Sequence, residues 1–234
     1  MATSSRNRGP QPNDKKLFDA KHLPALRAAT DDLCWLLTRE YGQDSSLQLV
    51  GNRYRLNKRQ RQAIGRTAAA DQAVAHRLSK QVALAELRDR SIAIDGFNLL
   101  ILLESAHGGG IILQGRDGTL RDLASVHGTY KHVQHTIPAL ITVGETLRHA
   151  GRITWYFDQP VSNSGRLKTL LRSLAEEHHF NWQVELAYNP DKELIVLPNE
   201  MIIVSSDSWI LDEGGPWCNL GREILQEQII PLVL

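Results

Sequence analysis

The sequence predicts an α/β domain with a mostly parallel sheet, preceded by a small all-α domain. The hydrophobic periodicity is helical from about residue 18, and at Arg90 it changes to short apolar runs typical of strands. Beyond Arg90, strand-like runs alternate with helix-like segments, which is the pattern of a parallel sheet covered by helices. With 42% hydrophobic residues, the 234-residue chain can bury a sizeable core.

The N-terminal half is expected to be helical apart from one ambiguous stretch. Leucines recur at helical spacing between residues 23 and 37. Residues 47–56 are ambiguous, and we expect a turn or a small hairpin around Gly51-Asn52. A long basic helix should begin at Asn57, and the Ala-rich stretch that follows should continue to Arg88 as one or two helices.

The C-terminal half should supply the sheet. A hairpin turning at Arg116-Asp117-Gly118 is expected within residues 108–123. The remaining predicted elements are strands at 91–94, 153–157, 182–187 and 201–204 and helices at 137–150 and 164–177.

The near-neutral total charge hides an uneven distribution. Residues 1–90 hold 17 basic and 9 acidic side chains, a net charge of +8, whereas residues 91–234 hold 10 basic and 17 acidic, a net charge of −7. Two regions with different roles follow. We therefore divide the chain into a flexible tail at 1–12, a basic helical domain at 13–90 and an α/β domain at 91–234.

Cysteine use and hydropathy bound the compartment. Cys34 and Cys218 lie far apart in the sequence, which excludes a disulfide framework and a Cys-based zinc site and favours two reduced, buried thiols. The polar N-terminus lacks the apolar stretch of a signal peptide, and no run is long enough to span a membrane. We expect a cytoplasmic protein without a membrane partner; a homo-oligomer is possible.

Three strand-like runs end in an aspartate: IAID at Asp95, ITWYFD at Asp158 and IIVSSD at Asp207. Ligands of open parallel sheets bind beyond the carboxyl ends of the strands, so these side chains are expected to point into one crevice. Asp212, five residues after Asp207, is expected to reach it too. Because packed carboxylates repel one another, a hard cation such as Mg²⁺ or Mn²⁺ would relieve the repulsion. Each aspartate alone also fits an ordinary turn or helix N-cap.

The same residues carry a resemblance to a known group. Ile94-Asp95-Gly96-Phe97-Asn98 resembles the DGxN motif of the PIN-like nucleases, especially their NYN branch. Tyr156-Phe157-Asp158 resembles the second-strand V-F-D of that branch. Val204-Ser205-Ser206-Asp207-Ser208, with Asp212, is similar to its late V-T-S-D segment and trailing acid. The three segments occur in order over roughly residues 91–215.

This resemblance implies a flavodoxin-like, PIN-like three-layer sheet and an acidic pocket for one or two Mg²⁺ or Mn²⁺ ions. It also implies hydrolysis of phosphodiesters, usually in RNA. The implied roles are Asp95 as first metal ligand, Asn98 as a residue that shapes the pocket or faces phosphate, Asp207 and Asp212 as further ligands, and Asp158 as a nearby acid. Asp95, Asp158, Asp207 and Asp212 would be the catalytic residues.

The sequence departs from the family pattern at the mid-domain acid. The nearest candidate metal ligand is Asp191, but only a turn or so of helix fits between it and Pro198. The resemblance also extends to an uncharacterised bacterial and archaeal family that joins a small helical domain to such a fold.

Two segments are candidates for substrate binding. The loop after Asp158 leads into a helix, and its Ser162, Asn163, Ser164 and Arg166 can contact a phosphate; an ordinary helix cap is the alternative. In the basic half, Arg55, Lys58, Arg59 and Arg61 belong to the densest positive stretch and can bind nucleic acid. The alternative for this stretch is a solvated helix face, or a patch docked on the acidic domain.

The leading hypothesis is a metal-dependent nuclease whose helical domain binds nucleic acid, with RNA favoured by the resemblance. A catalytically inactive RNA-binding or protein-interaction module with the same fold is the second. A third is another Mg²⁺-dependent phosphotransfer or receiver-like module, which the absence of a lysine at a later strand end disfavours.

Overall fold

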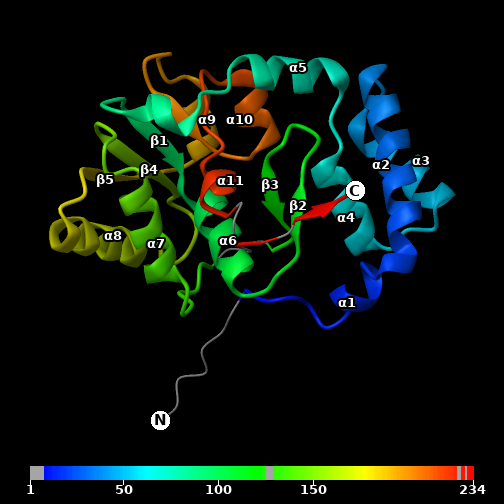
Figure 1. Ribbon diagram of the computed structural model, residues 1–234, viewed down its shortest axis with the longest axis horizontal. Helices are drawn as coiled ribbons and strands as arrows, with labels where there is room; N and C mark the ends of the chain where they lie inside the picture. Colours follow the sequence, from blue (N-terminus) through cyan, green and yellow to red (C-terminus); the bar gives the residue numbers. More distant parts are fainter. Residues whose placement is uncertain (1–7, 125–128, 226–227, 230) are drawn as a thin grey trace, which may run out of the picture.

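The computed structural model describes residues 8–124, 129–225, 228–229 and 231–234 (Figure 1). Its N-terminal part is helical, as predicted, and packs around a small core of Leu26, Leu33, Val50 and Ile64. The elements are α1 (Asp14–Leu17), a 3₁₀ turn η1 (Ala20–His22), α2 (Leu23–Thr38), α3 (Gln43–Arg53), α4 (Lys58–Thr67), α5 (Asp71–Ser79) and η2 (Leu84–Leu87).

One local prediction in this part is wrong. Most of segment 47–56 belongs to helix α3, not to a turn or hairpin. The helix buries Val50 and Gly51, and Gly51 lies so close to the Arg61 guanidinium that a Cβ there would approach it to 2.6 Å. Tertiary packing against α2 and α4 therefore decides a segment whose sequence pattern is weak.

The predicted start of the basic helix at Asn57 is confirmed. Asn57 accepts a hydrogen bond from Gln60 N at 3.0 Å, and the Gln60 side chain accepts one from Asn57 N at 3.3 Å. This reciprocal capping box fixes the first turn of α4. The helical stretch after it breaks between Thr67 and Asp71, which gives α4 and α5 as separate helices.

The main sheet has four parallel strands in the order β5-β4-β1-β6. They are β1 (Ile92–Asp95), β4 (Ile153–Asp158), β5 (Trp182–Ala187) and β6 (Ile202–Val204). Strand β1 lies between β4 and β6, and all four of its residues are buried. A continuous apolar run is what a central parallel strand requires, because helices cover both of its faces.

Side chains that alternate along the strands divide the domain into three layers. Ile92, Ile94 and Trp155 belong to the main core on one face of the sheet, whereas Ala93 and Ile203 belong to a smaller core on the other. The main core includes residues of α6 (Gly96–His107), α7 (Thr136–Thr146), α8 (Ser164–His178) and α11 (Leu220–Leu225). The smaller core includes residues of α9 (Pro190–Ile195) and α10 (Ser208–Glu213). The α/β fold class with mostly parallel strands is confirmed.

The predicted hairpin is present and belongs to a second, small sheet. Strands β2 (Ile112–Gln114) and β3 (Leu120–Asp122) are antiparallel, and β7 (Leu232–Val233) pairs with β2 in parallel. Gly118 supplies the positive φ of 79° that the turn needs. In Figure 1 this sheet lies between the α/β part and the N-terminal helices, so the two parts of the chain meet across it.

Three smaller expectations are also decided. Arg8 pairs with Glu104 of α6 and lies over the Tyr130 ring at 5.1 Å, so the expected flexible tail is anchored at this position; residues 1–7 of that tail lie outside the described residues. Cys34 and Cys218 are free and buried, as predicted. Among the described residues, no helix is both long and apolar enough to cross a membrane.

Candidate functional site

The topology of the main sheet defines one crevice at its carboxyl edge. From β1 the chain proceeds to β4 and β5 on one side and then returns to β6 on the other side of β1. Such a reversal of strand order opens a gap between the two loops that leave the sheet in opposite directions, and ligands of open α/β sheets bind there. Asp95 ends β1 and Asp207 follows β6, so both border this gap.

Asp95 is held at the end of β1 by its neighbours on both sides. Its carboxylate accepts a hydrogen bond from Ser205 Oγ at 2.8 Å and a longer one from Asn98 N at 3.4 Å, which caps α6. Gly96 is required next in the chain, because a Cβ there would lie 2.3 Å from the Phe157 ring. Because Gly96 has no side chain, α6 can begin close to β4, directly after the Asp95 carboxylate.

A short loop after β6 completes this wall of the crevice. Asn98 Oδ1 accepts hydrogen bonds from Ser206 N at 2.9 Å and from Ser206 Oγ at 3.0 Å, so Asn98 ties α6 to the loop that follows β6. Asp207 caps α10 by accepting from Trp209 N at 2.9 Å, and its own N donates to Ser205 Oγ at 3.0 Å. The loop is thus tied to α6 and to Asp95 rather than left free.

Three of the acidic side chains at this edge have raised pKa values. The pKa of Asp95 is raised to about 7: burial contributes most, the hydrogen bond from Ser205 opposes it, and the negative charges of Asp191 and Asp207 add to it. Burial also raises the pKa of Asp191, with Asp207 and Asp158 contributing in the same direction. Burial raises the pKa of Asp158 as well. Asp191 is therefore within electrostatic reach of both Asp158 and Asp207.

Asp191 is the member about which the sequence was least informative. It lies in α9, a helix of only six residues that Asn189 caps by accepting from Lys192 N at 3.1 Å. A single turn of helix is enough to place Asp191 near the sheet, because α9 follows β5 closely and packs against β1, β4 and β5. The short helix before Pro198 thus brings Asp191 to the carboxyl edge.

The donor types suit a hard cation, but the carboxylates are not gathered tightly. Across the described part of the chain, no group of three or more His, Cys, Asp or Glu side chains is arranged to hold a metal ion. Mg²⁺ commonly keeps several waters and uses only one or two protein carboxylates. The negative charges of Asp191 and Asp207 both act on Asp95, so these carboxylates are the candidates for that kind of binding.

The expectation that Asp212 joins the crevice is wrong. Both of its carboxylate oxygens accept from Arg77 of α5, at 2.7 Å to Nε and 2.8 Å to Nη2. Its backbone oxygen accepts from Lys80 Nζ at 3.2 Å. Asp212 lies on α10 at a position that faces the N-terminal helices, so this acid joins the two parts of the chain instead of extending the site.

The pair between Arg77 and Asp212 continues into a buried network that supports the site loop. Arg77 Nη1 also donates to Asp117 at 2.6 Å, and Arg121 Nη2 donates to the same oxygen at 2.7 Å. Arg121 Nε then donates to the backbone oxygen of Ser206 at 2.8 Å. The chain of contacts runs from α5 through the hairpin to the loop that carries Asp207.

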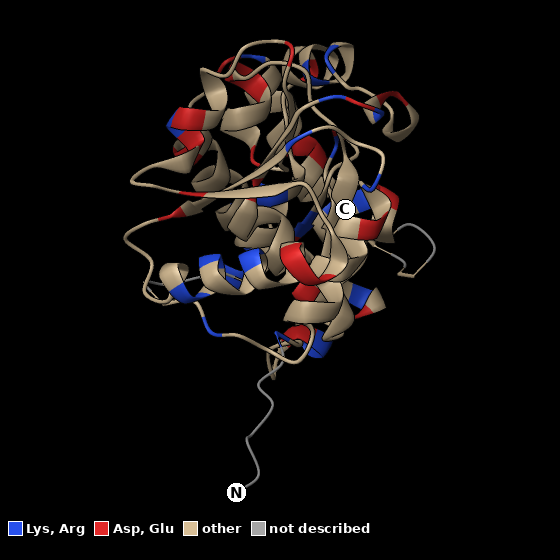
Figure 2. Cartoon of the chain, turned by 90° about the vertical axis from the view of Figure 1, so that its left-hand side faces the viewer, with Lys and Arg blue, Asp and Glu red and all other residues tan. Residues whose placement is uncertain are grey.

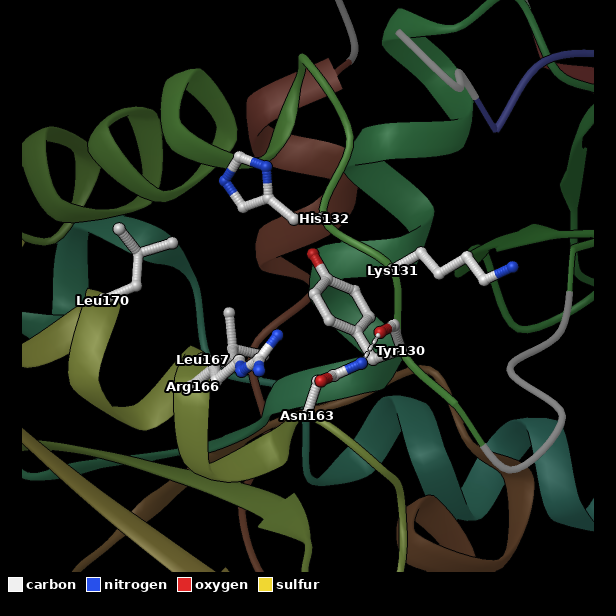
Figure 3. Close-up of a pocket in the computed structure, with 7 residues that line it drawn as sticks. All are labelled: Tyr130, Lys131, His132, Asn163, Arg166, Leu167 and Leu170. Atoms are coloured by element: carbon white, nitrogen blue, oxygen red, sulfur yellow. Dashed lines mark hydrogen bonds between the residues drawn. The ribbon is translucent and has the colours of Figure 1, made fainter. Parts of the chain in front are cut away.

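The side chains of the loop after Asp158, which were expected to contact a phosphate together, lie in different surroundings. The Ser164 hydroxyl contacts the backbone oxygens of Asp158 at 2.6 Å and Val161 at 2.7 Å, so this side chain closes the turn and is directed away from a ligand. Ser162 is exposed. Asn163 and Arg166 line a cavity, shown in Figure 3, together with residues of segment 130–132.

Two of the four basic side chains predicted to bind nucleic acid form hydrogen bonds within the protein. Arg59 binds Asp14 through two hydrogen bonds of 2.9 Å, and Arg61 binds Leu56 O at 2.9 Å and Asn52 Oδ1 at 2.9 Å. These two arginines stabilise the helical domain. Arg55 and Lys58 are exposed. Figure 2 views the molecule from the side opposite these N-terminal helices, and on that side basic and acidic segments are interspersed.

Fold and site together define an α/β protein with a doubly wound parallel sheet and an acidic site at its switch point. Residues 84–223, more than half of the chain, match the family model described as a domain of unknown function, DUF5616. The chain therefore belongs to the DUF5616 family. Residues 25–80 match a second model, described as a protein of unknown function, DUF434, and the two matches adjoin near the predicted boundary at residue 90.

A curated relative matches most of the chain. An uncharacterized protein of Methanocaldococcus jannaschii is 32% identical over 188 residues, which cover 80% of this chain and 89% of the relative. No solved structure matches the chain. Neither matching family model is a PIN or NYN model, so the resemblance to those nucleases remains a basis for proposals only.

Several site residues were not identified from the sequence. Ser205 stands in the quoted VSSD segment, and its proximity to a strand-end aspartate was a usable signal. Asp117 and Arg121 gave no such signal, because a charged hairpin normally points to solvent. Only the packing of the helical part against the hairpin buries them.

Proposed function

We propose that this protein is a metal-dependent nuclease that hydrolyses phosphodiester bonds, with RNA as the favoured substrate. The observation that supports it is the raised pKa of buried Asp95, to which the negative charges of Asp191 and Asp207 contribute. Asp207 and Asp158 in turn raise the pKa of Asp191. Buried carboxylates in electrostatic contact are costly unless a cation compensates them, and sites with such perturbed groups are commonly functional.

In this proposal a Mg²⁺ or Mn²⁺ ion, when bound, would supply an activated water and offset negative charge on the phosphate. Asp95 and Asp207 would hold the ion, and Asp158 and Asp191 would keep the crevice anionic. Ser205 fixes the orientation of the Asp95 carboxylate by its hydrogen bond, and Asn98 fixes the loop that carries Asp207. Because the raised pKa of Asp95 keeps a proton there up to about pH 7, binding of a cation releases that proton.

The experiment uses labelled single-stranded RNA and DNA with Mn²⁺ or Mg²⁺, and compares the intact protein with Asp95→Asn and Asp207→Asn. We expect cleavage that requires the cation and falls at least 100-fold in both variants. Asp71→Asn is the matched control, because that carboxylate pairs with Arg116 at the surface, outside the crevice and outside the network that supports the Asp207 loop; its activity should stay within a few-fold of the intact protein.

A second candidate function is a catalytically inactive RNA-binding or protein-interaction module, favoured by the lack of a tight metal-ligating group among the described residues. Under this alternative, RNA or a protein partner binds equally with and without divalent cations. Cation-independent binding without cleavage of RNA or DNA would exclude the nuclease proposal.

A further inference from the structure

The segment before α7 and the first two turns of α8 enclose a cavity of about 450 Å³ (Figure 3). This volume is within the range of small-ligand pockets. Segment 130–132 forms one side and residues 163–170 form the other, so the cavity begins only a few residues after Asp158 along the chain. Ser164 Oγ, next to Asn163 in the chain, donates to Asp158 O at 2.6 Å, so the wall of the cavity reaches the end of β4.

The walls of the cavity are fixed by hydrogen bonds and ring packing. Asn163 Nδ2 donates to Tyr130 O at 2.9 Å, and Tyr130 N donates to Ser162 O at 3.0 Å, so the two sides are joined directly. The Tyr130 ring packs on Phe97 at 5.4 Å between centroids, and its hydroxyl donates to buried Glu104. Asn163 is also held at a positive φ of 75°, a conformation that its amide contact stabilises. The cavity is therefore preformed.

Its chemistry combines an apolar surface with positive charge. Leu167 and Leu170 form the apolar wall, and Figure 3 shows the His132 ring across from Leu170. The Arg166 guanidinium lies at the opposite end, beside Asn163 and Tyr130. No Asp or Glu is among the lining residues. A ligand that fits has a flat, largely apolar ring at one end and an anion at the other.

We propose that this cavity binds one nucleotide unit of the substrate strand, with the base between His132 and Leu170 and a phosphate on Arg166. A nucleotide is the ligand class that joins a stacking ring to an anion over this length, and stacking on an aromatic ring tolerates any base. The proposal rests on the proposed nuclease function, because a strand seated here continues past Asp158 into the acidic crevice. The cavity would thus add affinity for the substrate strand at a place outside the metal site.

The test measures binding without divalent cations, so that cleavage plays no part. AMP, adenosine, inorganic phosphate and an adenosine hexaribonucleotide are titrated into the full-length protein by calorimetry. We expect AMP to bind more tightly than adenosine or phosphate alone. Arg166→Ala should weaken AMP and the hexamer about tenfold each and leave adenosine unchanged. Leu170→Trp, which fills the apolar end, should weaken all three organic ligands.

Arg172→Ala is the matched control, because it removes the same exposed charge from the same helix at a residue that does not line the cavity. It should change the affinities less than twofold. Equal losses in Arg166→Ala and Arg172→Ala, or no AMP binding at all, would overturn the proposal. Loss of AMP binding with unchanged hexamer binding would also overturn it, because the site would then serve a free nucleotide.

The outcomes separate the two proposals. Cation-dependent cleavage by a protein whose affinities do not respond to Arg166→Ala or Leu170→Trp contradicts the nucleotide pocket alone. Conversely, nucleotide and hexamer binding that responds as expected, in a protein that cleaves nothing with Mn²⁺, contradicts the nuclease function alone.

Discussion

The carboxylate of Asp117 is the centre of the contacts that join the helical part to the α/β part, so replacing it tests how much that junction stabilises. Its side chain is fully buried. One oxygen accepts from Arg77 at 2.6 Å and Arg121 at 2.7 Å, and the other accepts from Thr119 Oγ1 at 2.7 Å. The two arginines are the reason that the pKa of Asp117 lies far below its usual range, against the opposing effect of burial.

Asp117→Asn keeps the shape but removes the charge and turns an amide donor toward the guanidinium donors. Breaking a buried ion pair by removing one partner costs about 3–5 kcal/mol. For a chain of this size, that corresponds to a fall in Tm of roughly 6–20 °C. The assay is thermal and urea unfolding at pH 7 of the intact protein and the variant, followed by circular dichroism.

Asp71→Asn is the matched control, because Asp71 pairs with Arg116 at the surface, where both side chains are substantially exposed. An exposed pair is worth about 1 kcal/mol or less. The depressed pKa also fixes the pH window: the contribution of Asp117 is present above its unfolded pKa of about 3.9 and is lost as the pH falls below that value. Equal destabilisation by the two substitutions at pH 7, or a difference that persists unchanged at pH 2, would refute the reasoning.

Three further predictions concern the site. Asp95→Asn should raise the free energy of unfolding at pH 8 by up to about 4 kcal/mol and by much less at pH 5. The reason is that the folded pKa of about 7 makes the ionised carboxyl unfavourable as the pH rises. Urea unfolding at both pH values measures the difference. Mg²⁺ at 10 mM should raise the Tm of the intact protein more at pH 8 than at pH 6 and leave Asp95→Asn unchanged; an equal shift in both proteins would contradict a site at Asp95. Gly96→Ala should destabilise by about 1–3 kcal/mol, because the new methyl would overlap the Phe157 ring, whereas Gly165→Ala, with nothing within 4 Å, should not; chemical unfolding of both variants decides.

The order of elements was predictable wherever periodicity and turn chemistry agreed. Strand 182–187, the turn at Gly118 and the start of the basic helix at Asn57 are properties of a few consecutive residues, and each was found where the pattern placed it. The helix over residues 43–53 was not predictable, because its sequence is weakly amphipathic and it forms by packing on α2 and α4.

The candidate site shows the same division. Asp95, Asp158 and Asp207 were predicted to approach one another, since parallel strands end at one edge, and their neighbourhood follows from that geometry. Asp212 was misplaced because spacing along a helix does not say which neighbour the helix faces. The basic stretch shows a related limit: a count of charges does not show that Arg59 and Arg61 bind partners within the fold, whereas Arg55 and Lys58 are exposed.

By itself, the sequence determined the α/β class, the two free thiols, and the position of three aspartates at or just after the ends of parallel strands, because these depend on local pattern and composition. Only the tertiary structure decided that Asp191 reaches the carboxyl edge of the sheet, that Asp212 leaves it, and that the wall of a cationic, apolar cavity reaches the end of β4. The physical reason is that these features depend on contacts between residues far apart in the chain. Such contacts are fixed by how helices and strands pack, and no window of sequence contains both partners.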